Sequence, residues 1–241
     1  MDLLPFEPSP LPRPVRVLLD AGHGAPGNEG NTSSFGVLEK DFTLDLALDV
    51  AIDLEQSGFF EVTQSRDPTE STTYADRIER ARAAGADVFV SLHSDVRGTL
   101  RDWSPVPGLV ARSSSDAPGF SVLHSDEGDS VLAARRHLLA TDVADQMVAA
   151  GFFPYGGAEY VGLYAPDPSA PGVFVDRHAD DKRIYVLRRT SMPAIIVETH
   201  NALDPREAAR WDETYTRHAF VRALGRGIAR SLAPPGRPDV R

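Results

Sequence analysis

The chain has 241 residues, 41% of them hydrophobic and 25% charged, a composition that supports a folded core and excludes a disordered or collagen-like chain. Its 35 acidic and 25 basic residues give a net charge of −10, which argues against nucleic acid or anionic lipid as the partner. The chain contains no cysteine, so disulfides, thiol nucleophiles and cysteine-bound metals are excluded. Any metal must therefore bind to histidine and carboxylate side chains.

Proline-rich segments stand at both ends of the chain. Residues 1–14 (MDLLPFEPSPLPRP) contain five prolines and no periodicity, and we interpret them as a leader or linker. They lack the basic start and the apolar run of about 7 to 15 residues that mark a signal peptide. Residues 234–241 are predicted to form a flexible tail, which leaves one folded domain at 15–233. No run approaches the ~18 apolar residues of a membrane span, and we expect a monomer.

Short β-branched segments alternate with helical ones along this domain. In chain order we predict a strand at 15–20, a helix at 40–56, a strand at 60–64, a helix at 73–84, a strand at 87–93, a helix at 130–150, strands at 183–187 and 194–199, and a helix at 205–232. This alternation predicts an α/β fold, in which a mostly parallel twisted sheet of about six strands is flanked by helices.

Two long segments interrupt the alternation. Residues 96–127 and 151–182 are rich in Gly, Pro, Ser and Asp, and irregular segments of that length are usually functional or mobile. We therefore regard both as candidates for regulating a functional site.

Residues suited to catalysis or metal binding stand at the ends of the predicted elements. The first strand ends in DAGHG, which contains His23, and the strand at 87–93 ends in SLHSD, which contains His93. The carboxyl edge of an open α/β sheet is where ligands bind, so we expect the two histidines to converge. Glu39 opens the first helix, and Glu198 ends an apolar run.

This set of residues suits a catalytic zinc site. Two histidines and one glutamate are typical zinc ligands that leave a position open for water, and Glu198 is then the candidate general base and acid. Each residue also has an ordinary alternative: a strand-end histidine is commonly a surface residue, and Glu39 is a favourable charge at a helix N-terminus. The chain has no HEXXH motif, and spacing alone does not choose between these interpretations.

Four further residues are weaker candidates. Asp20 is placed either to orient the nearby histidine or to cap a turn. His200 shares a face with the catalytic candidate if the strand continues, so it is a candidate for holding the substrate carbonyl or binding metal. Arg188 and Arg189 are candidates for binding a peptide carboxylate, with surface salt bridges as the alternative.

The remaining charged side chains are predicted to lie on the surface. An acidic stripe at every fourth residue of the first helix is typical of a solvated helix face. Four histidines have no motif around them and are predicted to be surface residues. These two sets are Asp41, Asp45, Asp49 and Asp53, and His124, His137, His178 and His218.

Five ordered segments resemble one enzyme family. The strings LLDAGHG, LEKDFTLDLALDVAIDLE, TQSRD, ADVFVSLHSD and MPAIIVETHNALDPREA are similar to those of the zinc-dependent N-acetylmuramoyl-L-alanine amidases of the AmiA/AmiB/AmiC and CwlV type, over about residues 15–232. The resemblance implies that His23, Glu39 and His93 bind Zn²⁺ and that Glu198 is catalytic. It implies hydrolysis of the amide bond between N-acetylmuramic acid and L-alanine in peptidoglycan, in the periplasm or outside the cell.

The chain departs from the family pattern next to the site. Asp95 stands where the family usually has Asn, which makes it a candidate for contacting a metal ligand or the substrate, and the family's E-x-G-F-x-S-N is replaced by ETHNA. In some relatives an insertion blocks the groove until an activator protein displaces it, so autoinhibition by residues 151–182 is a hypothesis here. Two alternatives remain open: a zinc amidohydrolase of the same fold acting on soluble muropeptides or another amide, and a non-catalytic cell-wall-binding module.

Overall fold

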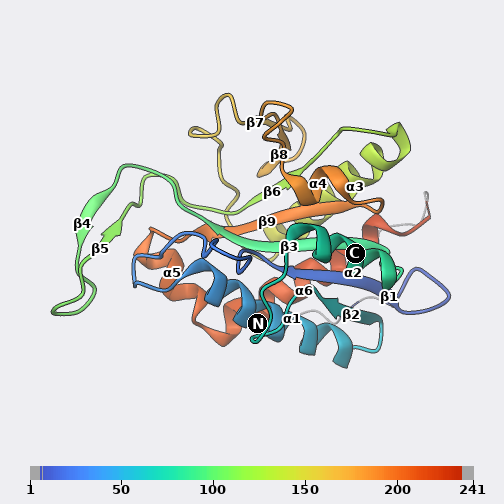
Figure 1. The fold of residues 1–241 in the computed structure, drawn as a ribbon, viewed down its shortest axis with the longest axis horizontal. Helices are drawn as coiled ribbons and strands as arrows, with labels where there is room; N and C mark the ends of the chain where they lie inside the picture. The colour runs from blue at the N-terminus through green and yellow to red at the C-terminus, as the bar shows by residue number, and fades with distance from the viewer. Residues whose placement is uncertain (1–5, 7, 235–241) are drawn as a thin grey trace.

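One sheet runs through the centre of the protein, with helices packed against it (Figure 1). The computed structural model describes residues 6 and 8–234, and its main sheet has seven strands in the order β2-β1-β3-β9-β6-β8-β7. The strands are β1 Val15–Ala21, β2 Phe60–Gln64, β3 Val88–Asp95, β6 Ser121–His124, β7 Tyr164–Pro166, β8 Val173–Asp176 and β9 Ala194–Asn201. The pairs β9–β6 and β8–β7 are antiparallel and the other pairs are parallel. The predicted α/β fold with a mostly parallel sheet is confirmed.

Six helices of the described chain accompany this sheet. They are α1 Glu39–Gln56, α2 Tyr74–Ala83, α3 Ser130–Ala149, α4 Tyr185–Arg189, α5 Pro205–Trp211 and α6 Thr214–Ser231. Alternate residues of each strand pack on opposite faces: Ile195 and Val197 of β9 join the core beneath α1, α3 and α6, whereas Ile196 joins the core beneath α2 and α4. The two faces therefore have separate hydrophobic cores. No helix in the described ranges has the length and apolar character needed to cross a bilayer.

The structure corrects two predicted elements. Residues 185–189 form helix α4 rather than a strand, and its adjacent residues Val186 and Leu187 are both buried against the sheet. The predicted closing helix is two helices. Asp204 caps α5 through the backbone N–H groups of residues 206 and 207, and the chain turns at residues 212–213 before α6 begins.

The two segments predicted to be irregular contain strands. Residues 96–127 form strand β6 and the separate hairpin of β4 (Arg101–Trp103) and β5 (Ala111–Ser113), which projects at the left of Figure 1. Residues 151–182 supply β7 and β8, and they bury Tyr155 and Tyr160 against Phe174 in the core on the α2 side. These strands are three or four residues long, too short for a sequence pattern to predict. Because residues 151–182 are part of the core, deleting them is not a clean test of autoinhibition.

The ends of the chain are described only in part. Residues 1–5, 7 and 235–241 lie outside the described residues, and with them most of the predicted tail and part of the predicted leader. Within the predicted leader, the Phe6 ring lies 5.9 Å from the Phe60 ring. The Arg13 guanidinium donates two hydrogen bonds of 2.7 Å to Asp87.

The acidic stripe of α1 faces another helix rather than solvent alone. Arg217 of α6 donates to Asp45 and Asp49, both at 2.6 Å, and His218 bonds Asp53 at 2.5 Å. The prediction of a solvated face holds for Asp45 and Asp49, whose side chains are 63% and 46% exposed, whereas that of Asp53 is 18% exposed. Helix α6 packs beside α1 and places basic side chains against the stripe.

Candidate active site

Three predicted metal ligands lie together at the carboxyl edge of the sheet. His23 Nε2 is 2.9 Å from Glu39 Oε2, and His93 Nδ1 is 3.0 Å from Glu39 Oε1 and 3.1 Å from His23 Nε2. Their ligand atoms all lie within 4.8 Å of one another. Residues separated by up to 70 positions in sequence therefore form one cluster, which we call the HEH cluster.

The strand register explains this convergence. β1 and β3 are parallel neighbours, with Asp20 opposite Ser91 and Ala21 opposite Leu92, so the residues that follow them leave the sheet at the same edge. His23 turns toward the cluster in a left-handed backbone conformation with φ of 60°, which is uncommon for a residue with a side chain.

Backbone and amide groups hold Glu39, the third predicted ligand. The Glu39 carboxylate accepts hydrogen bonds from the Asn31 backbone N–H at 3.1 Å, the Asn31 Nδ2 at 2.7 Å and the Ser94 N–H at 3.0 Å. Gly30 lies against it with φ of 75°, and a Cβ there would be 2.6 Å from Glu39 Oε2 and 2.8 Å from His23 Cδ2. The loop can thus close on the cluster only with glycine at this position.

The HEH cluster fits zinc in both donors and spacing. Ligand atoms about 2.0–2.1 Å from a tetrahedral zinc lie about 3.3 Å from one another, close to the 2.9–3.1 Å seen here. Burial favours the neutral carboxyl of Glu39, but hydrogen bonds from His23 and His93 outweigh it and hold the Glu39 pKa well below its usual value. The site is therefore built around an ionised carboxylate, the form that binds a cation.

Asn28 fixes the orientation of His23. Its Oδ1 accepts from His23 Nδ1 at 2.8 Å and from the Gly30 N–H at 3.1 Å, while its Nδ2 donates to the Tyr74 hydroxyl at 2.6 Å. Because Oδ1 can only accept, His23 Nδ1 carries a proton and Nε2 faces the cluster. Asn28 follows the DAGHG string in a loop without periodicity, so no sequence pattern marks it.

Glu198 lies beside this cluster. In the sheet, Glu198 of β9 pairs with His93 of β3, and neighbouring strands are about 4.8 Å apart. Its Oε2 is buried and has no hydrogen-bond partner among the residues that the structure describes. Burial raises the Glu198 pKa well above its usual value, the charges of Asp95 and Glu39 add to that, and Arg97 opposes it. A carboxyl group whose pKa is raised in this way is suited to hold and release a proton in acid–base catalysis.

Asp95 forms a hydrogen-bonded group beside Glu198 that the sequence analysis only partly anticipated. Tyr160 donates a hydrogen bond to Asp95 Oδ2, and the Tyr160 hydroxyl lies 2.8 Å from Ser121 Oγ. Arg97 lies 3.4 Å from Asp95 and stacks on the Tyr155 ring at 3.9 Å. Burial and the Asp95 charge raise the Tyr160 pKa, so this phenol stays protonated. Tyr160 comes from a segment that carries no catalytic motif, so no sequence signal pointed to it.

His200 does not share the face of Glu198. The register shifts between the pairs His93–Glu198 and Asp95–Asn201. Between these pairs the chain advances three residues along β9 but only two along β3. This bulge breaks the alternation of side chains. His200 is 3% exposed and stacks on Trp211 with ring centroids 5.4 Å apart, and burial lowers its pKa to about 3. The structure therefore does not bring His200 together with Glu198 on one face of β9.

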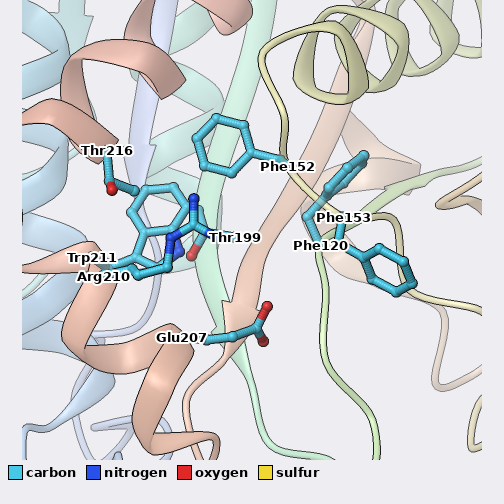
Figure 2. A pocket seen from close by; sticks show the side chains of 8 residues that line it. All are labelled: Phe120, Phe152, Phe153, Thr199, Glu207, Arg210, Trp211 and Thr216. Atoms are coloured by element: carbon cyan, nitrogen blue, oxygen red, sulfur yellow. The ribbon is translucent and has the colours of Figure 1, made fainter.

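Figure 2 shows the pocket on that opposite face of β9, where Thr199 and Trp211 lie together. The pocket is lined by Phe120, Phe152, Phe153, Thr199, Glu207, Arg210, Trp211 and Thr216. None of these residues belongs to the HEH cluster, so the pocket is separate from the candidate metal centre.

Arg188 and Arg189 lie away from the site. They end α4, directly before β9 begins, whereas Glu198 lies near the carboxyl end of β9. Arg188 bonds the Asp180 carbonyl at 2.6 Å and pairs with Glu127 at 3.2 Å, and both arginines are exposed. The structure therefore gives them no position near the cluster, and the salt-bridge interpretation holds for Arg188.

One histidine predicted to be a surface residue is buried. His124 is 1% exposed, and neither ring nitrogen has a hydrogen-bond partner in the described part of the chain. Burial and the neighbouring His137 lower its pKa to about 4. It ends β6, a strand too short to be predicted.

Comparisons with known proteins agree with the geometry. A family model described as N-acetylmuramoyl-L-alanine amidase matches residues 17–230. AmiC of Neisseria meningitidis is 26% identical, over 91% of this chain and 53% of AmiC, and CwlM of Bacillus licheniformis is 24% identical, over 91% of this chain and 68% of CwlM. The chain thus spans about half the length of the AmiC relative.

A solved structure shares the fold. AmiC2 of Nostoc punctiforme is 25% identical and superposes with a TM-score of 0.64, covering 90% of this chain and 97% of AmiC2. The family match spans nearly all of the described sheet and includes the HEH cluster and Glu198. The chain therefore belongs to the N-acetylmuramoyl-L-alanine amidase family.

Proposed function

We propose that the protein hydrolyses the amide bond between N-acetylmuramic acid and L-alanine in peptidoglycan, with Zn²⁺ held by His23, Glu39 and His93. Family membership supports the reaction. The observation that carries the mechanism is the pairing of Glu198 with His93 across two parallel strands, which puts an unpartnered carboxylate oxygen beside three metal-competent side chains.

Different contacts prepare the proposed ligands for the metal. His23 presents Nε2 because Asn28 binds its other nitrogen, and Glu39 is held as an anion by both histidines. When bound, zinc acts as a Lewis acid and lowers the pKa of water. The amide carbonyl of the substrate would lie next to the cluster, where its developing negative charge is stabilised.

Glu198 moves the proton. Its Oε2 accepts a proton from the water that attacks the amide carbon and then donates it to the nitrogen of L-alanine as the C–N bond breaks, so the products are a carboxylic acid and a free amine. The apolar surroundings that raise its pKa favour the second of these steps. The hydrogen-bonded pair of Asp95 and Tyr160 lies beside it, and Tyr160 is buried.

The substrate form and the compartment follow from this activity. Intact peptidoglycan lies outside the cytoplasm, so we place the protein in the periplasm or outside the cell. Soluble muropeptides are the second candidate substrate, since Asp95 replaces the asparagine that is usual in the family. A requirement for an activator protein remains a prediction.

The test compares wild type with Glu198→Gln. We expect the variant to keep its zinc content and fold but to lose about 10²–10⁴-fold in hydrolysis rate, the usual contribution of a general acid–base group. Glu213→Gln, which changes an exposed carboxylate, is the matched control and should retain full activity. Mass spectrometry of digests of intact sacculi and of free muropeptides identifies the bond cleaved and the preferred form. Full activity in Glu198→Gln would disprove the mechanism, and products cut elsewhere would disprove the assigned bond.

A further inference from the structure

A buried arginine joins the segments that carry the two histidines. Arg77 of α2 is completely buried. Its Nη1 donates to Asp20 Oδ1 at 2.8 Å and to the Ala21 carbonyl at 2.9 Å, and its Nη2 donates to the carbonyl of His23. One guanidinium therefore contacts the end of β1 at three points, although it touches no ligand imidazole.

Asp20 extends this contact to the second histidine. The other carboxylate oxygen, Asp20 Oδ2, lies 2.6 Å from Ser91 Oγ, and Ser91 Oγ lies 3.1 Å from His93 Nε2. Both Asp20 and Ser91 are buried. A continuous chain of hydrogen bonds thus runs from Arg77 through Asp20 and Ser91 to His93.

The protons available along this hydrogen-bonded path determine the tautomer of His93. A carboxylate paired with arginine has no proton to donate, so the single hydroxyl proton of Ser91 goes to Asp20. Ser91 then has only lone pairs left for His93, and Nε2 of His93 must donate. With Nε2 donating, Nδ1 of His93 is the nitrogen left to bind a metal, and it is the atom that faces Glu39 and His23.

The contact with the first histidine acts on its backbone. His23 has φ of 60°, and among the described residues it is the only one other than glycine with a positive φ. Such a conformation persists only where surrounding contacts enforce it. The hydrogen bond from Arg77 to the His23 carbonyl is one of those contacts, and the same guanidinium holds Asp20.

We propose that Arg77 is a positioning residue for the metal centre, which acts on both histidine ligands at once. Through Asp20 and Ser91 it sets the tautomer and ring orientation of His93, and through the His23 carbonyl it holds the left-handed turn that directs the other imidazole. Partners of this kind usually contribute 10- to 100-fold to metal affinity, as an order of magnitude. The inference rests on the proposed metal centre and is independent of which amide is hydrolysed.

The test uses three variants of the full chain. Ser91→Ala breaks the path to His93 alone, and Arg77→Lys keeps the charge but removes the forked contact with both segments. Arg136→Lys is the matched control, because Arg136 is also buried but, among the described residues, its guanidinium donates only to the carbonyls of Glu127 and Thr190, at 3.0 and 2.9 Å. Circular dichroism and urea unfolding establish that each variant is folded.

Two readouts separate positioning from general stability. Chelator competition gives the zinc dissociation constant, which we expect to rise about 10- to 100-fold in Ser91→Ala and Arg77→Lys and to stay within about twofold in Arg136→Lys. Long-range ¹H–¹⁵N NMR of the zinc-loaded protein reports which ring nitrogen of His93 carries the proton, because in the metal-free protein the same imidazole also donates to Glu39. His93 should carry its proton on Nε2 in wild type and become a mixture in Ser91→Ala.

Unchanged zinc affinity in folded Ser91→Ala and Arg77→Lys would overturn the inference, as would a wild-type His93 with its proton on Nδ1. If Arg77→Lys does not fold, Ser91→Ala decides the outcome. The zinc and NMR measurements do not involve hydrolysis, so a failure of the proposed amidase activity would be recognised separately in the sacculus digests.

Discussion

Replacing Gly30 by alanine should damage the metal centre far more than the same change at Gly27. Both glycines lie in the loop between β1 and α1, with φ of 75° and 74°. A Cβ at residue 27 meets nothing within 4 Å, whereas a Cβ at residue 30 would be 2.6 Å from Glu39 Oε2, 2.7 Å from Glu39 Cβ and 2.8 Å from His23 Cδ2. Comparing the two variants thus separates the free-energy cost of the left-handed backbone from the effect of the close contacts with Glu39 and His23.

The magnitudes follow from these distances. A left-handed conformation costs a residue with a Cβ about 1–2 kcal/mol, and both variants should lose that much in free energy of unfolding. Carbon atoms pack at about 3.5–4.0 Å, so in Gly30→Ala the side chains of Glu39 and His23 must move by roughly 1 Å. Metal sites tolerate about 0.2 Å. We therefore expect Gly30→Ala to bind zinc at least about tenfold more weakly, which corresponds to about 1.4 kcal/mol.

Urea unfolding of the metal-free proteins measures the loss in free energy of unfolding, and chelator competition measures the loss in zinc affinity. Gly27→Ala should lose stability but bind zinc like wild type. If Gly30→Ala binds zinc as tightly as Gly27→Ala, then the loop does not constrain the ligands, and the role assigned to Gly30 is wrong.

Two further predictions concern buried polar groups. The pKa of His124 falls from about 6.5 in the unfolded chain to about 4 in the fold, so its contribution to stability is present above pH 6.5 and is lost as the pH falls toward 4, by up to about 1.4 kcal/mol per pH unit. Urea unfolding between these pH values should show that the free energy of unfolding depends less steeply on pH in His124→Leu than in wild type, and an unchanged dependence would contradict the buried neutral state. Tyr160→Phe removes the hydroxyl that bonds Asp95 and Ser121 and should lower the free energy of unfolding in urea by about 1–3 kcal/mol. The control is Tyr185→Phe, at an exposed tyrosine, and a loss in Tyr160→Phe no larger than in this control would show that the hydrogen-bonded group does not stabilise the fold.

The longer helices and strands were predictable from sequence because their hydrophobic patterns extend over enough residues to be recognised. The buried strand at 87–93 and the helices at 40–56, 73–84 and 130–150 all lie within a few residues of the observed elements. Strands β6, β7 and β8 have only three or four residues and are held by their neighbours in the sheet, so their own sequences carry little signal. Helix α4 was mistaken for a strand because five residues with two adjacent apolar side chains fit either structure.

The residues that act through others were harder to predict than the candidate ligands. The candidate ligands stand at strand and helix ends, where glycines and apolar runs mark them in the sequence. Asn28, Ser91, Arg77 and Tyr160 are recognisable only by the atoms they contact, and those contacts join positions up to 71 residues apart in the chain.

The sequence by itself determined the chemistry available to this protein: without cysteine, a metal centre must use histidine and carboxylate, and DAGHG, SLHSD and the apolar run before Glu198 already point to one edge of a parallel sheet. Only the tertiary structure decided which side chains meet there. A bulge in β9 turned His200 to the opposite face, the packing of α2 on the sheet placed Arg77 between the two histidine segments, and residues 151–182 brought Tyr160 to Asp95. The physical reason is that one shifted residue in a strand reverses the faces of the side chains beyond it, and a buried polar group takes whichever partner the packing offers.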